Sequence, residues 1–243
     1  MKRYGKELGI GPDVVVLSDD TDRAKVISEY LRSIGIGNAL DDASGAGMRD
    51  LLGAIDAHRT RHNARNCRCS EDRSHYGVSL EEIADAYGAA LKAQGAIDFP
   101  GMLLSLAELL DDDEWVLEHF RALYRHILVD EGQDLTAIQT RLLRQLAGDS
   151  INLFVVADDR QSIRGYAGGA FSHAEALVPV AARTPLHLHH NFRCATRILR
   201  AAEAVLQPMA EKRRVEAPEH APPGNVRFRP MSSPEAEADW IDR

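Results

Sequence analysis

The sequence predicts an α/β protein in which a parallel sheet follows a mostly helical N-terminal half. The runs Ile127–Val129 and Leu153–Val156 are short and apolar, both end in acidic residues, and a helical pattern lies between them. Short apolar strands that alternate with amphipathic helices are typical of parallel sheets. Upstream of His126 the apolar residues recur mainly at helical spacing, which predicts that this half is largely helical.

The N-terminal half begins with an apolar run, Val14–Leu17, that we interpret as a strand or a buried extended segment. Apolar residues from Val26 to Ile34 recur at helical spacing, and Gly35 follows where a left-handed helix cap belongs. A second helix is expected around Met48–Ile55. The arginine-rich stretch His58–Tyr76 lacks apolar periodicity and predicts an exposed loop or an irregular helix end.

Three more helices are predicted before the first of the two apolar runs. Ser79 and Glu82 have the spacing of a capping box, which opens the first of them. The apolar residues of Met102–Leu110 and of Trp115–Leu123 predict the other two.

The C-terminal part predicts the beginning of another α/β unit. Leu186–His190 is an extended candidate that leads into a helix around Ile198–Val205. The proline-rich segment Glu216–Gly224 predicts a linker. Beyond it, Val226–Phe228 predicts a strand, and Glu235 stands near the expected start of a helix.

Composition favours a folded protein without a membrane segment. Of the 243 residues, 44% are hydrophobic and 27% charged, as is usual for soluble domains. No apolar run approaches the roughly 20 residues that span a bilayer, and the N-terminus lacks the apolar core of a signal peptide, so a cytoplasmic location is expected. Three cysteines fit reduced thiols, and the net charge of -8 argues against coating nucleic acid by bulk electrostatics.

The first apolar run ends in the acidic segment Asp130–Asp134. Ligands of open α/β sheets bind at the carboxyl ends of strands. One carboxylate there can hold Mg²⁺ while its neighbour orients an attacking water and accepts its proton. The alternative is that an acid such as Asp134 caps the following helix, but a cap needs only one acid.

The second apolar run leads into a glycine-spaced loop, Asp158–Gly169, that carries Gln161, Arg164 and Tyr166. An amide and an aromatic ring at the same sheet edge could sense a phosphate and stack on a nucleobase. A surface turn with a half-buried tyrosine is the alternative interpretation.

Three segments together resemble the second, third and fourth motifs of UvrD/Rep-type superfamily 1 DNA helicases, in order and at similar spacing. They are Asp130-Glu131-Gly132-Gln133-Asp134, Asp158-Asp159-Arg160-Gln161-Ser162-Ile163 and Asn191-Phe192-Arg193-Cys194. The resemblance implies an incomplete RecA-like parallel sheet, the core of a P-loop NTPase motor, with a helical 1B-like subdomain. It implies a 1B-like subdomain at 1–97, part of the first motor lobe (1A) at 98–184 and the start of the second lobe (2A) at 185–243, with a linker near 216–224.

The same resemblance implies a site for ATP and Mg²⁺. Asp130 would bind the metal ion, Glu131 would be the general base, and Gln161 would sense the γ-phosphate. Arg193 would reach that phosphate from the second lobe and stabilise charge in the transition state.

Two aromatic residues match the family at binding positions. Phe192 stands where the family usually has a tyrosine that stacks on adenine, and Tyr166 would stack on a base of single-stranded DNA. The partner that the resemblance implies is single-stranded or partly duplex DNA. The sequence departs from the family pattern at three neighbouring positions, Ala157, Arg164 and Ala167. The last two put the strength of the DNA and phosphate contacts in question.

The phosphate-binding loop GxxxxGK[ST] is absent from these 243 residues. Lys6 is the only lysine that follows a glycine, and Glu7 comes after it. Most of the binding energy for a triphosphate is therefore missing, so slow or no turnover is expected from the isolated chain. It would then be a truncation or part of a split enzyme whose second chain supplies the loop.

Three functions fit these observations. The first is a fragment of an ATP-dependent 3′ to 5′ DNA helicase or translocase that acts in repair or recombination. The second is a non-catalytic module that binds single-stranded DNA or a partner. The third is a motor subunit of a helicase-nuclease complex.

A histidine and cysteine cluster offers a weaker signal. His58, His62, Cys67 and Cys69 could give four ligands to Zn²⁺, although a Cys-x-Cys pair is looser than the usual CxxC hairpin. A solvated basic loop that touches DNA phosphates is the alternative.

Overall fold

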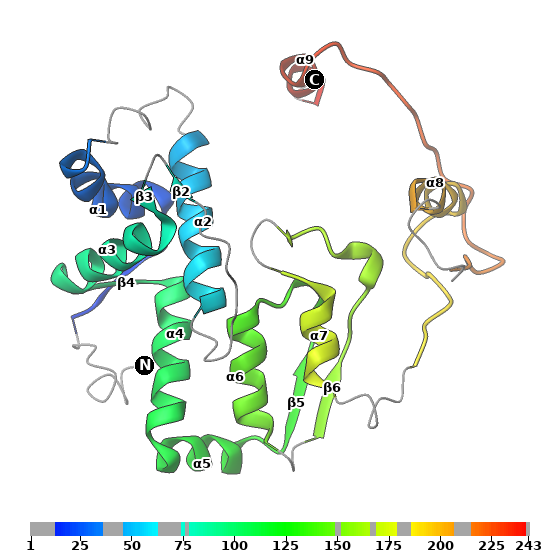
Figure 1. Cartoon of the computed structure of the whole chain (residues 1–243). Helices are drawn as coiled ribbons and strands as arrows, with labels where there is room; N and C mark the ends of the chain where they lie inside the picture. The colour runs from blue at the N-terminus through cyan, green and yellow to red at the C-terminus, as the bar shows by residue number, and fades with distance from the viewer. Residues whose placement is uncertain are drawn as a thin grey trace. The chain divides into compact units, whose positions relative to one another are not determined.

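The computed structural model describes residues 13–35, 46–62, 74–75, 78–148, 152–165, 169–178, 186–206 and 215–241. The chain divides into two compact units, Met1–Arg183 and Thr184–Arg243, which are described separately. Figure 1 shows the elements of the first unit from blue to yellow. The predicted subdivision of this unit at residue 97 stays a prediction.

The N-terminal part of the first unit consists of three packed helices and two short strand pairs. Strand β1 pairs in parallel with β4, and β2 pairs antiparallel with β3. The bounds are β1 Val15–Leu17, α1 Asp20–Ser33, α2 Ala46–His62, β2 Ser74–His75, β3 Val78–Ser79, α3 Leu80–Ala93 and β4 Ala96–Asp98.

The three helices bury one apolar core, which confirms the predicted helical periodicity. Ile27, Ile55 and Ile83 are each fully buried in it, one from each helix. Ser79 and Glu82 form the predicted capping box at the start of α3. Gly35 follows α1 with φ +80°, a conformation that favours glycine.

Helix α2 extends beyond Ile55 and reaches His62, so of the two predictions for the stretch from His58, the helix end fits its first residues and the exposed loop does not. The side chains of Arg59 and Thr60 explain the extension. Thr60 is buried and its hydroxyl donates to the Asp56 carbonyl at 2.7 Å. Polar residues therefore continue the inner face of α2.

The buried carboxylate of Asp98 joins the helical part to the rest of the unit. Asp98 is 0% exposed and caps the next helix by accepting from the Gly101 N–H at 2.8 Å. It also accepts from the Tyr87 hydroxyl at 3.0 Å and from Arg59 Nη1 at 2.8 Å. Arg23 Nη2 lies 3.4 Å from it. Residues of α1, α2, α3 and the next helix thus all contact the Asp98 carboxylate.

Charges and rings around Asp98 compensate for its burial. The guanidinium carbons of Arg23 and Arg59 lie 5.8 and 5.4 Å from the centre of the Tyr87 ring. Arg23 also pairs with Asp56, whose carboxyl pKa is raised because burial outweighs the attraction of the arginine. Burial raises the pKa of Tyr87 from 10.0 to about 12. The stability that Tyr87 contributes is therefore present below pH 10 and is lost as the pH rises through 12.

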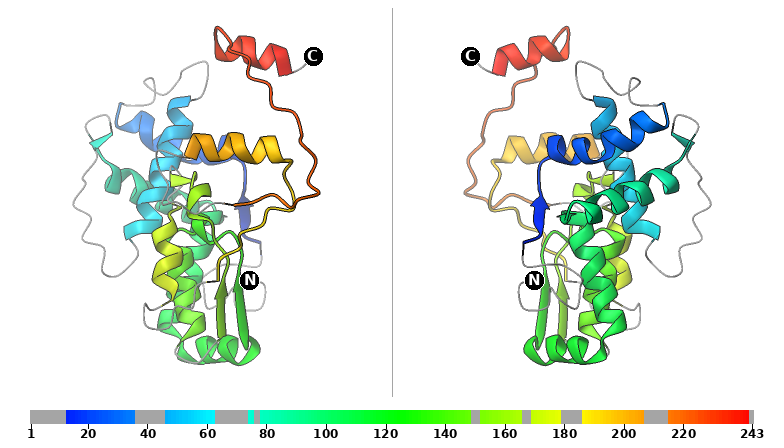
Figure 2. Two further views of the ribbon diagram at one scale, coloured as in Figure 1. Left: turned by 90° about the vertical axis from the view of Figure 1, so that its right-hand side faces the viewer. Right: turned by 90° about the vertical axis from the view of Figure 1, so that its left-hand side faces the viewer.

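The second part of the first unit has the predicted α/β pattern. Strands β5 and β6 are parallel and in register from His126↔Asn152 to Val129↔Val155. Figure 1 shows α6 between α4 and this strand pair, and in both views of Figure 2 the two strands lie to one side of the green helices. The bounds are α4 Phe99–Asp112, α5 Glu114–Leu123, β5 His126–Val129, α6 Ala137–Ala147, β6 Asn152–Val155 and α7 Phe171–Leu177, with 3-10 turns η2 Gly132–Asp134 and η3 Asp159–Gln161.

Helices α4, α5 and α6 enclose a second apolar core. Leu110, Val116 and Ile138 are almost completely buried there, one from each helix. On the strands, Leu128 is 76% exposed and Phe154 is 54% exposed, so one face of the β5–β6 pair is open within the described residues. The parallel α/β prediction is confirmed for these two strands, and a fuller RecA-like sheet stays a prediction.

The second unit contains two described helices and little other regular structure. Helices α8 Thr196–Leu206 and α9 Pro234–Ile241 occur where the sequence predicts them. The predicted extended run Leu186–His190 contributes only one isolated bridge, His190↔Glu216, and Val226–Phe228 is not a strand. Among the described residues, the apolar side chains of these two runs have no sheet to pack in, and Leu188 is 85% exposed.

Replacing Asp98 with alanine should destabilise the first unit strongly. The substitution leaves the buried Arg23 and the partly buried Arg59 without their shared carboxylate and removes the cap of α4. Loss of one partner of a buried ion pair typically costs about 3 to 5 kcal/mol. The midpoint of urea unfolding, followed by circular dichroism, measures the loss.

Glu108→Ala is the matched control, because Glu108 is an exposed residue of the same helix. Its effect on the free energy of unfolding should stay within about 0.5 kcal/mol. Equal midpoints for the two variants would contradict the role given to Asp98.

Candidate functional site

The first candidate residues follow β5 directly, where the strand ends. The Glu131 N–H donates to Asp130 Oδ1 at 2.9 Å, and both residues are exposed. Glu131 has φ +50° and is the only residue other than glycine with a positive φ in the described part of the chain. A left-handed backbone at such a residue costs free energy and is typical of functional turns.

A hydrogen bond from Gly132 connects this turn to the end of β6. The Gly132 N–H donates to the Val156 carbonyl at 2.8 Å, and the Val156 N–H donates to Val129 at 2.8 Å. A Cβ atom at Gly132 would lie 2.8 Å from Val155 Cγ1, so no larger residue fits without a shift. The two strand ends therefore stay side by side past the last residue of the ladder.

The side chain of Gln133 bridges the two turns. It is only 2% exposed, and its Nε2 donates to Glu131 Oε2 at 2.6 Å. Its Oε1 accepts from the Asp158 N–H at 3.0 Å. The sequence reasoning assigned no role to Gln133, although an amide among four acidic or glycine neighbours was a signal that it could have used.

Gln161 lies in the turn that follows β6. Its Nε2 donates to Asp158 Oδ2 at 2.7 Å, and the same carboxylate accepts from the Arg160 N–H at 3.0 Å. Gln161 is exposed. Asp130, Glu131 and Gln161 are thus carried by turns at the same edge of the strand pair.

Asp134 does not cap α6, so that alternative is wrong. The cap is Thr136, which forms a capping box with Gln139. Asp134 instead lies 4.0 Å from Arg164 Nη1, and its Oδ1 is buried without a hydrogen-bond partner. Arg164 of the loop after β6 thus approaches the acidic segment after β5.

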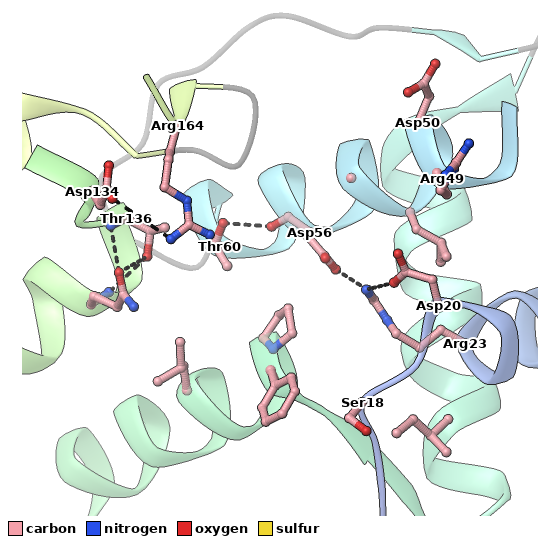
Figure 3. A pocket seen from close by; sticks show the side chains of 17 residues that line it. Ser18, Asp20, Arg23, Arg49, Asp50, Asp56, Thr60, Asp134, Thr136 and Arg164 are labelled. Atoms are coloured by element: carbon pink, nitrogen blue, oxygen red, sulfur yellow. Dashed lines mark hydrogen bonds and ion pairs between the residues drawn. The ribbon is translucent and has the colours of Figure 1, made fainter. Parts of the chain in front are cut away.

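A separate cavity of about 720 Å³ lies between the helical part and the α/β part of the first unit. Figure 3 shows Arg23 and Asp56 on one side of it and Asp134 with Arg164 on the other. Phe99 also lines it. The cavity therefore borders the acidic segment at Asp134, but neither Asp130 nor Glu131 lines it.

The remaining candidates lie in the second unit or outside the described residues. Asn191 Oδ1 accepts from the N–H groups of Arg193 and Cys194 at 3.0 and 2.8 Å, which shapes a tight turn. Phe192 is 79% exposed and stacks on His190 with ring centres 6.1 Å apart. That Arg193 and Phe192 meet the strand-edge residues stays a prediction. Tyr166 lies outside the described residues.

The zinc hypothesis is not tested, because Cys67 and Cys69 lie outside the described residues and so does the side chain of His62. His58 lies in α2. Within the described ranges, no group of three or more His, Cys, Asp or Glu side chains is placed to hold a metal ion. No described helix combines the length and apolarity that crossing a membrane requires.

Comparison with known proteins gives one family match and several relatives. Residues 1–177 match the UvrD/REP helicase N-terminal domain. The chain is 34% identical to DNA helicase II of Escherichia coli (strain K12) over 137 residues, which are 54% of this chain and 19% of that protein. It is 26% identical to ATP-dependent DNA helicase PcrA of Staphylococcus aureus (strain Mu50 / ATCC 700699) over 216 residues, which are 88% of this chain and 28% of that protein.

The matched regions thus span between about a fifth and a third of these relatives. The family model covers the helical part, both acidic turns and α7, and the resemblance drawn from the three motifs is confirmed. The chain belongs to the UvrD/REP helicase family.

Proposed function

We propose that this chain is part of an ATP-dependent DNA helicase or translocase in which the β5 and β6 turns form half of the nucleotide site. The observation that carries the proposal is the parallel register of the two strands, which brings Asp130, Glu131 and Gln161 to one edge. Nucleotide sites of open α/β sheets lie at this edge. The printed names of the relatives, DNA helicase II and PcrA, support DNA as the substrate.

Asp130 suits a magnesium ion. Its carboxylate is exposed, and only Oδ1 accepts a hydrogen bond from the described residues, so Oδ2 is available to a cation or to its bound water. Mg²⁺ prefers such oxygen ligands and keeps several waters. When bound, the ion would neutralise charge on the phosphates.

Glu131 is the proposed general base. It follows Asp130 directly, and its Oε2 is held by Gln133. A water that attacks the γ-phosphorus must lose a proton as the new P–O bond forms and the bond to ADP breaks. The proposed acceptor of that proton is the Glu131 carboxylate.

Gln161 and Arg193 would complete the response to the γ-phosphate. The Gln161 amide donates to Asp158 Oδ2, and on contact with a phosphate it would donate to a phosphate oxygen instead. Arg193 would contribute a permanent positive charge, and Phe192 would offer its exposed ring to the adenine. Direction of travel from 3′ to 5′ and a role in repair or recombination rest on the family resemblance.

An alternative function is a non-catalytic module that grips single-stranded DNA. Such a module would need no phosphate-binding loop, whose lysine and N–H groups supply much of the affinity for triphosphate. A motor subunit of a helicase-nuclease complex, with the loop on a second chain, is the third candidate.

The 243-residue chain alone should show no DNA-stimulated ATPase activity. Joining it to the flanking family segments, including a phosphate-binding loop, should restore hydrolysis, because the N–H groups and the lysine of the loop then bind the triphosphate. In that completed protein Glu131→Gln should lower kcat by about 10² to 10⁴ while leaving nucleotide binding intact. Phosphate release and binding of a fluorescent ATP analogue are the two measurements.

Glu108→Gln in the completed protein is the control, since Glu108 is exposed on α4, away from the two turns. It should hydrolyse ATP like the unchanged protein. Full hydrolysis by the Glu131→Gln variant would remove Glu131 from its proposed role. Turnover by the chain alone would contradict the need for the loop.

Tyr166→Ala should weaken binding of single-stranded DNA. Loss of one base-stacking ring costs about 1 to 3 kcal/mol, and Tyr166→Phe should keep most of the affinity because it keeps the ring. Fluorescence anisotropy with a labelled oligothymidylate at fixed salt measures both variants. Equal affinity of the alanine variant and the unchanged chain would refute the stacking role.

A further inference from the structure

Gln133 connects the two turns that carry the candidate catalytic groups. It is 2% exposed, and its amide spans from Glu131 Oε2, at 2.6 Å, to the Asp158 N–H, at 3.0 Å. Asp158 in turn holds the Gln161 side chain through its Oδ2 at 2.7 Å. A continuous hydrogen-bonded path therefore runs from Glu131 to Gln161.

The centre of this path must be a side chain that both donates and accepts, as the Gln133 amide does. An ionised carboxylate such as Glu131 accepts hydrogen bonds only, and a backbone N–H donates only. One side chain must therefore donate at one end and accept at the other. Glutamate in place of Gln133 would keep the acceptor for Asp158 but repel Glu131, and methionine would offer neither group.

The surroundings of Gln133 make this arrangement hard to replace. The residue is almost completely buried, so a water molecule cannot simply take the place of its amide between the two turns. The hydroxyl of Ser162 also approaches the Gln133 carbonyl, at 3.5 Å. The preceding residue, Gly132, is fixed against β6 by its bond to Val156.

We propose that Gln133 is a positioning residue that couples Glu131 to the Asp158–Gln161 turn. It holds the carboxylate of the proposed base in one orientation and ties that orientation to the turn that carries the proposed phosphate sensor. Contact of Gln161 with a phosphate would then be transmitted through Asp158 and Gln133 to Glu131. This role rests on the proposed function, but the bridge itself can be measured without any catalysis.

The bridge is tested by amide hydrogen exchange of the 243-residue chain, followed by NMR. In Gln133→Met the Asp158 amide should exchange about tenfold faster, since the hydrogen bond that protects it is gone. The Val156 amide donates to Val129 within the strand pair and should keep its rate. In Gln133→Glu the Asp158 amide should stay protected, because a carboxylate still accepts from it.

Gln145→Met is the matched control. Gln145 is also a glutamine with internal bonds, but its Nε2 donates to the Ala107 carbonyl at 3.2 Å, between α6 and α4. It should leave the Asp158 rate unchanged. If Gln133→Met leaves the Asp158 rate unchanged, or accelerates Asp158 and Val156 equally, the bridge is refuted.

The coupling to Glu131 is tested in the protein completed with the phosphate-binding loop. Gln133→Glu should lower kcat about tenfold or more with KM nearly unchanged, because the base loses its donor while the nucleotide-binding groups remain. An unchanged kcat would overturn the positioning role. Absence of ATPase activity in the unchanged completed protein would instead defeat the proposed function, and the exchange rates would still decide whether the bridge exists.

Discussion

The parallel pairing of β5 and β6 is the constraint on which the candidate site depends. Parallel strands end at the same edge, so the turns that follow Val129 and Val155 become neighbours although 25 residues separate Gln133 from Asp158. Two features extend the pairing beyond the ladder. The bond from Gly132 to Val156 fixes the backbones, and the Gln133 amide links the Glu131 carboxylate to the Asp158 N–H.

A second constraint, the buried Asp98 carboxylate, determines where the helical part meets the α/β part. It begins α4 and is contacted by Tyr87 of α3 and by arginines of α1 and α2. Because α4 packs against α6, this one charge links the helical core to the layer beside the strands. The 720 Å³ cavity lies at the same junction, with Arg23 and Asp56 in its wall.

The sequence predicted the elements whose pattern is local. The run Ile127–Val129, the capping box at Ser79 and the helices around it follow from periodicity and cap chemistry. The end of α2 at His62 was not predicted, because periodicity of apolar residues does not detect the polar contacts of Arg59 and of the buried Thr60. Gln133 was missed because its second partner, the Asp158 N–H, becomes a neighbour only when β5 and β6 pair.

The most direct test of the central claim is to locate a bound cation with Mn²⁺ in place of Mg²⁺. In NMR spectra of the ¹⁵N-labelled chain, Mn²⁺ should broaden the amides of residues 130–134 and 158–161 together and most strongly. Asp130→Asn should abolish that broadening in both segments at once. Broadening of one segment without the other, or broadening that survives the substitution, would contradict a single site at the shared edge of β5 and β6.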